Sequence, residues 1–124
     1  MRRVVGAFAG GKILNAKTAR SQLLGGIVWG IGLALLERTE RDPRNGRVVT
    51  RELQDYHLPV NADVPPIEVI LVDEVDPHVS EVGAKGLGEI GITGMGAAIS
   101  SAVFHATGRR VRDLPIRVER ILPR

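Results

Sequence analysis

The sequence contains no cysteine, and this absence removes several classes of protein at once. Disulfide scaffolds, iron–sulfur clusters and most structural zinc sites all depend on cysteine sulfur. A chain without cysteine suits a reducing compartment, and we therefore expect a cytoplasmic location.

Aromatic residues are also scarce, because the 124 residues include only one Trp, one Tyr and two Phe. Glycine, by contrast, occurs 15 times, well above its average share of roughly 7%. A core made largely of Val, Ile, Leu, Ala and Gly favours close backbone packing over bulky side chains. The length suits a single domain, and we expect residues 1–124 to form one.

The sequence has neither a long hydrophobic run nor the pattern of a nucleic-acid-binding face. The longest apolar run, residues 23–36, has 14 residues and is shorter than the roughly 20 that span a bilayer. The net charge is +3, and arginines near the C-terminus are interleaved with acidic residues. Nucleic-acid binding would need stacking aromatics or a recognition helix beside them. We expect neither a membrane nor a nucleic-acid partner.

Apolar patterns predict a small mixed sheet with two main helices, which is an α+β or α/β fold. Strands are expected at residues 2–8 and 67–72, and the second is apolar enough to be central. Residues 38–51 carry the turn chemistry of a hairpin. The tail from residue 114 fits either a short strand or a helical turn.

Two helices are expected, and local signals mark their ends. Asn15 can cap a helix over residues 16–37, and Gly108 can end a helix over residues 93–106. Each glycine inside the first helix lowers the stability of that helix by up to about 1 kcal/mol relative to Ala. Close approach of another backbone or of a bound molecule would explain four such glycines: Gly25, Gly26, Gly30 and Gly32.

The most informative segment is VGAKGLGEIG, residues 82–91, which follows a polar turn and leads into the second helix. Its glycines let backbone N–H groups approach a ligand without interference from a Cβ atom. A carboxylate held in such a loop can serve as a general base once it is partly buried. Glu89 occupies this place in the sequence.

The composition of this segment also fits two other structures. A Gly-rich loop before a helix can hold phosphate, although the segment matches neither a Walker loop nor a Rossmann fingerprint. It equally fits a tight turn in which Glu89 only favours the helix dipole. Composition alone leaves these alternatives open.

Metal sites formed by side chains are not expected. The three histidines have no spacing typical of metal ligands. Asp73, Glu74 and Asp76 lack the longer ligand series and the central glycine of a calcium loop. A polar turn is therefore the expected structure after the second strand.

Four collinear motifs carry a resemblance to a known family. Residues 85–89, KGLGE, are similar to a K-G-x-G-E segment that closes an active site. Residues 11–15 and 22–32, GKILN and QLLGGIVWGIG, are similar to the block G-x-x-L-N-P, Q-x-x-G-G and G-x-G. Residues 56–59 and 113–116, YHLP and DLPI, also have counterparts. Together they resemble the molybdenum-cofactor-binding subunit of the xanthine dehydrogenase/aldehyde oxidase family.

The resemblance implies that the chain is the C-terminal part of a molybdenum hydroxylase subunit. Glu89 is then the general base for hydroxylation of a heterocycle or an aldehyde with oxygen from water. A molybdopterin-type molybdenum cofactor, in dinucleotide form, would be bound in part by six residues: Gln22, Trp29, Lys85, Gly86, Leu87 and Gly88.

The sequence departs from the family pattern at three positions. Ala9 stands where an Asp is common, and Ala16 replaces the Pro that follows the Asn. Many relatives have Gln where this chain has Trp29, whose indole N–H can only donate a hydrogen bond. We therefore expect Trp29 to lie in the core more readily than beside the cofactor.

Members of the family are several-fold longer than this chain, and their electron-transfer centres lie on other domains or subunits. The resemblance thus implies three partners: the upstream half of the molybdenum subunit, iron–sulfur subunits and, as an option, a flavin subunit. A split-gene product and a truncated remnant both fit. Alone, the chain should bind no cofactor, be inactive and form a homo-oligomer, because the run 23–36 exceeds what it can hide. The alternative is a catalytically silent assembly or interaction module.

Overall fold

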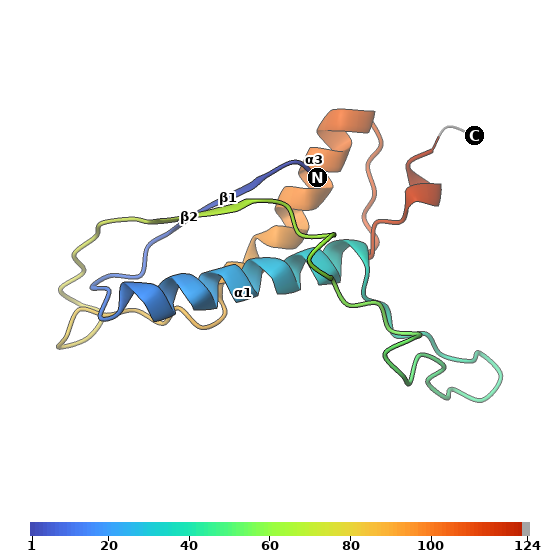
Figure 1. Ribbon diagram of the computed structural model, residues 1–124, viewed down its shortest axis with the longest axis horizontal. Helices are drawn as coiled ribbons and strands as arrows, with labels where there is room; N and C mark the ends of the chain where they lie inside the picture. The colour runs from blue at the N-terminus through green and yellow to red at the C-terminus, as the bar shows by residue number, and fades with distance from the viewer. Residues whose placement is uncertain (123–124) are drawn as a thin grey trace.

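Helix α1, Ala16–Leu35, is the element around which the computed structural model of residues 1–122 is organised (Figure 1). A parallel two-stranded sheet lies along one side of this helix, and two shorter helices contact another. The remaining elements are, in chain order, β1 (Val4–Phe8), β2 (Ile67–Leu71), α2 (Ile90–Thr93), α3 (Met95–Thr107) and the 3-10 helix η1 (Val118–Arg120). The expected small sheet with two main helices is confirmed.

Local signals set both ends of α1. The Asn15 side-chain oxygen accepts hydrogen bonds from the backbone N–H groups of Lys17 and Thr18, each at 3.1 Å. This is the predicted N-cap. At the other end, the N–H groups of Leu36 and Glu37 both donate to the Gly32 carbonyl, at 2.9 and 2.8 Å. The helix therefore ends two residues before the predicted boundary at residue 37.

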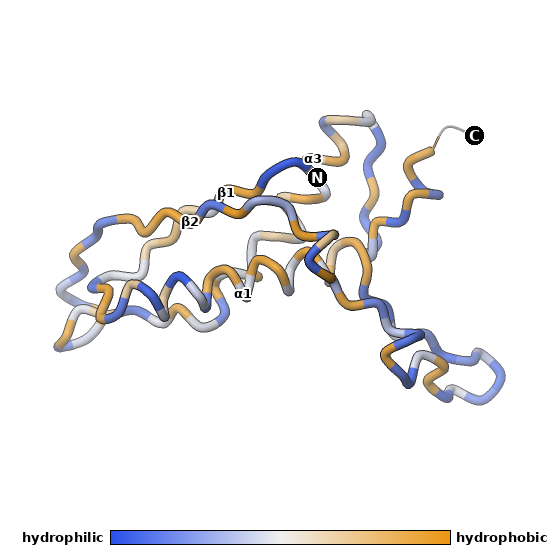
Figure 2. Tube along the Cα trace, viewed as in Figure 1, coloured by the Kyte–Doolittle hydropathy of each residue, from blue (hydrophilic) through white to orange (hydrophobic). Residues whose placement is uncertain are grey.

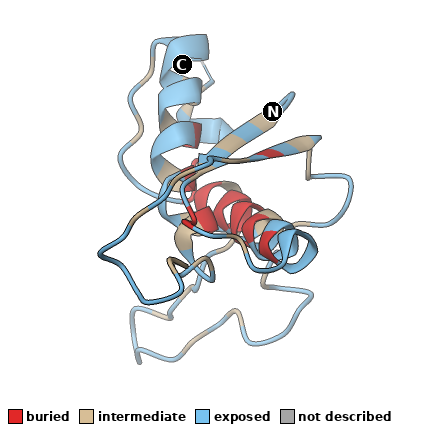
Figure 3. Cartoon of the chain, turned by 90° about the vertical axis from the view of Figure 1, so that its left-hand side faces the viewer, coloured by how far each residue is buried: buried red, intermediate tan, exposed pale blue. Residues whose placement is uncertain are grey.

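The core is a single stripe of α1 and the side chains that meet it. Leu23, Ile27 and Ile31 follow one another at four-residue spacing and are at most 1% exposed. Figure 3 shows that the buried residues are concentrated on this helix. The residues that complete the core come from other parts of the fold: Ala34, Val69, Met95, Ile99 and Ile116.

Two glycines of α1 are there because another helix crosses closely. A Cβ atom on Gly26 would lie 2.9 Å from the Cα of Gly91, the second residue of α2. Gly30 has the same relation to the Met95 side chain at the start of α3. The expected close approach of another backbone is confirmed at these positions. Gly25 differs, because nothing lies within 4 Å of its Cβ position.

The prediction that residues 67–72 form a central strand is wrong for the part of the chain that the structure describes. β2 pairs with β1 in parallel, from Val4 opposite Ile67 to Phe8 opposite Leu71, and the sheet has two strands. Its α1-facing side buries Val69, whereas Ile70 is 44% exposed on the other face. The apolar run is covered on one face only.

The hairpin prediction is correct for the turn and wrong for the strands. Asp42 N–H donates to the Arg47 carbonyl at 2.8 Å, and a single antiparallel bridge joins Arg41 to Val48. This segment projects from the end of α1, and Figure 2 shows that it is mostly hydrophilic. Without an apolar face to pack against the rest of the fold, the ladder does not extend.

The helix predicted over residues 93–106 is confirmed as α3, Met95–Thr107, and the short helix α2, which was not predicted, precedes it. Gly108 ends α3 with a φ angle of +69°, as predicted. By length and composition alone, Ile90–Thr107 could cross a membrane, and 17% of it is buried. A single segment of this kind is weak evidence, because core helices of soluble proteins meet the same criteria.

Adjacent glycines of α1 offer a matched pair of substitutions. Gly25→Ala should raise the free energy of unfolding by up to about 1 kcal/mol, because the methyl group meets open space and Ala favours the helix. Gly26→Ala should lower it by about 1–3 kcal/mol, because the methyl group would overlap the α2 backbone. Urea denaturation of both variants checks this. Equal effects of the two substitutions would contradict the described packing of α1 against α2.

Candidate functional site

Backbone hydrogen bonds hold the Gly-rich loop against the turn that follows β1. Lys12 N–H donates to the Gly83 carbonyl at 2.8 Å, and Lys85 N–H donates to the Gly10 carbonyl at 3.0 Å. Gly11 lies between them with a φ angle of +60°, and a Cβ atom there would overlap the Gly83 carbonyl oxygen. Two glycine segments that are far apart in the sequence therefore form one backbone unit beside the start of α1 (Figure 1).

This unit lies where the parallel strands end, which is the usual location of ligand sites beside parallel sheets. The segment after β1 contributes Gly11–Ile13, and the segment after β2 contributes the acidic turn of residues 73–76. Together with residues 80–83 they line a pocket of about 710 Å³. This pocket was not expected from the sequence, although the two segments that follow the strand ends were a signal for it.

Lys85 connects the Gly-rich loop to the acidic turn. Its ammonium nitrogen lies 2.6 Å from Glu74 Oε1 and 3.2 Å from Asp76 Oδ2. The lysine side chain is 25% exposed, and those of its two partners are 34% and 31% exposed. Glu74 and Asp76, two of the three acidic residues considered as a cation cluster, thus face a lysine. No group of three potential metal-ligating side chains occurs within residues 1–122.

The pKa values of Lys85 and Asp76 are both shifted in the direction that favours the charged form. The pKa of Lys85 is raised, chiefly by its hydrogen bond to Glu74 and then by that to Asp76. The pKa of Asp76 is lowered, chiefly by the backbone N–H of His78 at 3.0 Å and then by Lys85. The lysine therefore remains charged and committed to this contact.

A smaller pocket brings three of the predicted site residues together. Gln22, Lys85 and Leu87 line a space of about 250 Å³ with residues 12–15 and Thr18. Gly86 and Gly88 flank Leu87 in the chain, and nothing lies within 4 Å of the Cβ position of either. The backbone on both sides of Leu87 is thus open to a ligand.

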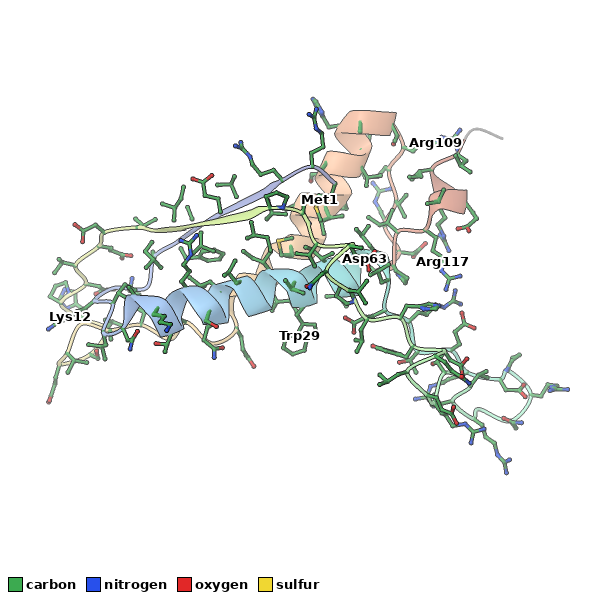
Figure 4. All side chains as sticks on the ribbon, in the orientation of Figure 1. Met1, Lys12, Trp29, Asp63, Arg109 and Arg117 are labelled. Carbon is green, nitrogen blue, oxygen red and sulfur yellow. The ribbon has the colours of Figure 1, made fainter. Side chains whose placement is uncertain are left out.

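Trp29 lies apart from this group, and the expectation that it belongs to the core is wrong. It is 57% exposed, and Figure 4 shows it projecting from α1 on the side away from the sheet. The small pocket includes Gln22, two helical turns earlier, but not Trp29. The stripe of Leu23, Ile27 and Ile31 already fills the interior. Position 29 therefore lies on a solvent-facing side of α1.

Glu89 occupies the N-cap position of α2, immediately after the open glycines. Its φ and ψ angles are −121° and −6°, and its side chain makes no capping hydrogen bond. Its backbone carbonyl accepts a hydrogen bond from Ile92 N–H at 3.2 Å. Glu89 is exposed, and a general base at this position would need partial burial by polypeptide outside residues 1–122.

Comparison with known proteins gives one family and several longer relatives. The profile of a family described as "Molybdopterin cofactor-binding domain" matches residues 1–65. The molybdenum-binding subunit PaoC of the aldehyde oxidoreductase of Escherichia coli K12 is 48% identical over 122 residues. That match covers 98% of this chain and 17% of PaoC. The xanthine dehydrogenase molybdenum-binding subunit of E. coli O157:H7 is 38% identical, over 96% of this chain and 16% of that subunit.

Solved structures match the whole of the architecture as well. Quinoline 2-oxidoreductase from Pseudomonas putida 86 superposes with a TM-score of 0.84 and 32% identity, over 94% of this chain and 15% of that one. The aldehyde oxidoreductase of Desulfovibrio desulfuricans ATCC 27774 gives a TM-score of 0.85 and 33% identity, over 98% and 13%. The chain thus spans only a small fraction of the length of the proteins it matches.

The contact of Lys85 with its two carboxylates should make the Gly-rich loop sensitive to pH at both extremes. Because the Asp76 pKa is lowered on folding, its stabilisation is present above about pH 4 and is lost as the pH falls through the folded-state value. Because the Lys85 pKa is raised, its stabilisation is present below about pH 10 and is lost as the pH rises further. NMR order parameters of the Gly86 and Gly88 amides should fall in both ranges.

A substitution at neutral pH distinguishes the effect of losing the Lys85 ion pairs from the effect of general unfolding in acid. Lys85→Met should lower the same order parameters already at pH 7, because the two carboxylates lose their partner. Lys12→Met is the matched control, since Lys12 is exposed on the neighbouring segment and takes part in none of the ion pairs found in residues 1–122. Equal order parameters in wild type and Lys85→Met would show that the backbone alone holds the loop.

Proposed function

This chain belongs to the molybdopterin cofactor-binding family that includes the molybdenum-binding subunits of aldehyde oxidoreductase and xanthine dehydrogenase, and we propose that it supplies the general base and part of the cofactor cradle of such an enzyme. The reaction is hydroxylation of an aldehyde or a heterocycle with oxygen from water. The observation that carries this proposal is Glu89, whose carboxylate follows a backbone-held glycine loop and makes no capping hydrogen bond.

The loop fits a large polar cofactor because its open surface is backbone. Gly86 and Gly88 have free space where Cβ atoms would lie, and their peptide groups can hydrogen-bond a ligand that approaches closely. Gln22 adds an amide to the adjoining pocket. A molybdopterin-type molybdenum cofactor in its dinucleotide form would be held in part by these groups. When bound, the cofactor supplies the oxidising centre of the reaction.

Lys85 and Leu87 act on the cofactor through the loop. The Lys85 ammonium is engaged by Glu74 and Asp76, so its contribution is to fix the loop between the glycines and the acidic turn. Leu87 lines the small pocket and packs partly against the core, which orients the peptides on both sides of it. Trp29 lies outside the pocket, and we assign it no contact with the cofactor.

Glu89 moves the proton in this proposal. One carboxylate oxygen would accept the proton of the water-derived oxygen as that oxygen forms its bond to the electron-poor carbon of the substrate. The hydrogen of that carbon would leave with its bonding electron pair to the oxidising centre that the cofactor would supply. The carboxylate is free for this role because it does not cap α2. The loop places it through backbone contacts, so the side chain itself need not contribute to folding.

The complete enzyme requires more polypeptide than this chain. Several relatives are named as subunits, among them subunit gamma of the 6-hydroxypseudooxynicotine dehydrogenase complex of Paenarthrobacter nicotinovorans. We infer a cytoplasmic complex in which the remaining part of the molybdenum-binding subunit is the direct partner. Iron–sulfur subunits, with a flavin subunit as an option, would carry electrons away.

Replacing Glu89 by Gln tests the general base in an enzyme reconstituted from this chain and the complementary part of PaoC. Glu89→Gln keeps the shape of the side chain and removes the basic carboxylate, so kcat should fall by about 10²–10⁴-fold. Molybdenum content and thermal stability should stay unchanged. Glu52→Gln, at an exposed position that lines neither pocket of the candidate site, should leave kcat intact. A molybdenum-replete Glu89→Gln enzyme with wild-type turnover would end the catalytic interpretation.

The chain purified alone should hold far less than one molybdenum atom per molecule. The loop and the small pocket form one side of a cradle, and they leave the site open to solvent. Elemental analysis of the chain, expressed in a host that makes the cofactor, provides the measurement. A content near one molybdenum per chain would show that residues 1–124 form a complete binding site.

A further inference from the structure

The chain exposes more surface than a compact protein of its mass. Its accessible surface is 9120 Å², whereas a folded monomer of 13.4 kDa exposes about 6,500 Å². The surplus of about 2,600 Å² is roughly three times the 800 Å² that each partner buries in an interface of standard size. A large part of the surface of this molecule is therefore available for contact with another polypeptide.

The clearest part of this surface is the bare face of α1, which consists of Gln22, Gly25, Trp29 and Leu33. These residues lie within a narrow sector of the helix because they are spaced three or four apart. Trp29 is 57% and Leu33 is 44% exposed. From Leu23 to Leu35 the helix has no charged residue, and a helix that is apolar all round is typical of a protein interior. Here one side of it faces solvent.

We infer that the bare face of α1 is the docking surface for the remaining part of the molybdenum-binding subunit. This inference rests on the proposed function. The chain spans 17% of PaoC, so the remainder is a polypeptide several times larger than this one. A second copy that buried a standard patch would cover only about a third of the surplus surface. The larger occupant fits the area that has to be covered.

The bare face is also continuous with the candidate site. Gln22 belongs to the bare face and lines the small pocket with Lys85 and Leu87. A polypeptide that covers Trp29 and Gly25 would reach Gln22 within one further turn of the helix. The same docking event would therefore close the solvent side of the cradle. Trp29 would be its anchor, since tryptophan is enriched among residues that dominate interface energies.

Gly25 provides a test that leaves the isolated chain intact. Nothing lies within 4 Å of its Cβ position, so Gly25→Met should fold and should keep or raise the thermal midpoint of the chain. The new side chain would nevertheless obstruct the docking surface. Ala102→Met is the matched control, because it adds the same side chain at an exposed position of α3.

The experiment mixes this chain with PaoC from which the matching segment has been removed, and measures binding by titration and by light scattering. Wild type and Ala102→Met should bind equally, and Gly25→Met should bind at least tenfold more weakly. Trp29 is the only tryptophan of the chain. Labelling this chain alone with 5-fluorotryptophan should therefore give one ¹⁹F resonance, which becomes protected from solvent in the complex.

Each other outcome is decisive. If Gly25→Met binds as tightly as wild type, or if Trp29 stays exposed in the complex, the docking surface is wrong although the proposed function stands. If the wild-type complex forms but retains no molybdenum, the proposed function fails and the docking surface holds. If the wild-type chain does not bind, or remains a homo-oligomer with Trp29 protected, the inferred occupant is overturned.

Discussion

The close contact between the backbones of α1 and α2 determines where the candidate site lies. A Cβ atom on Gly91 would lie 2.8 Å from the Leu23 carbonyl oxygen, and one on Gly26 would lie 2.9 Å from the Gly91 Cα. Only glycine at both positions lets the two helices approach this far. Because Glu89 is two residues before Gly91, this contact also sets the distance of its backbone from α1. The sheet, the loop and α3 are arranged around that crossing.

In the Gly-rich loop, charged side chains fix the position of the loop, and backbone groups form the surface that is open to a ligand. Lys85 forms ion pairs with both Glu74 and Asp76 at the side of the loop, and these contacts hold the loop in place. The open peptides at Gly86 and Gly88 carry no competing side chain. A ligand therefore meets a surface whose hydrogen-bonding groups are fixed before it arrives, which reduces the entropy lost on binding.

The exposed side of α1 links the small core to the proposed assembly. The nine buried apolar side chains among residues 1–122, which are the eight of the core cluster and Ala19, form a modest core for a chain of 124 residues. The sequence of α1 nevertheless has the composition of an interior helix, with Trp29 and Leu33 on its bare face. Composition and burial agree once a further layer of protein covers that face. The open cradle and the exposed Glu89 have the same explanation.

The sequence by itself determined the features that depend on neighbouring residues. Asn15 caps α1 through N–H groups two and three residues away, and Gly108 ends α3 because its positive φ angle costs glycine nothing. The four collinear motifs, of which residues 85–89 are one, likewise indicated the family without any knowledge of the fold. Tertiary structure decided what depends on contacts between distant segments. It turned Lys85 toward Glu74 and Asp76 and left Trp29 in solvent. Burial depends on which surfaces meet, and helical periodicity does not specify that.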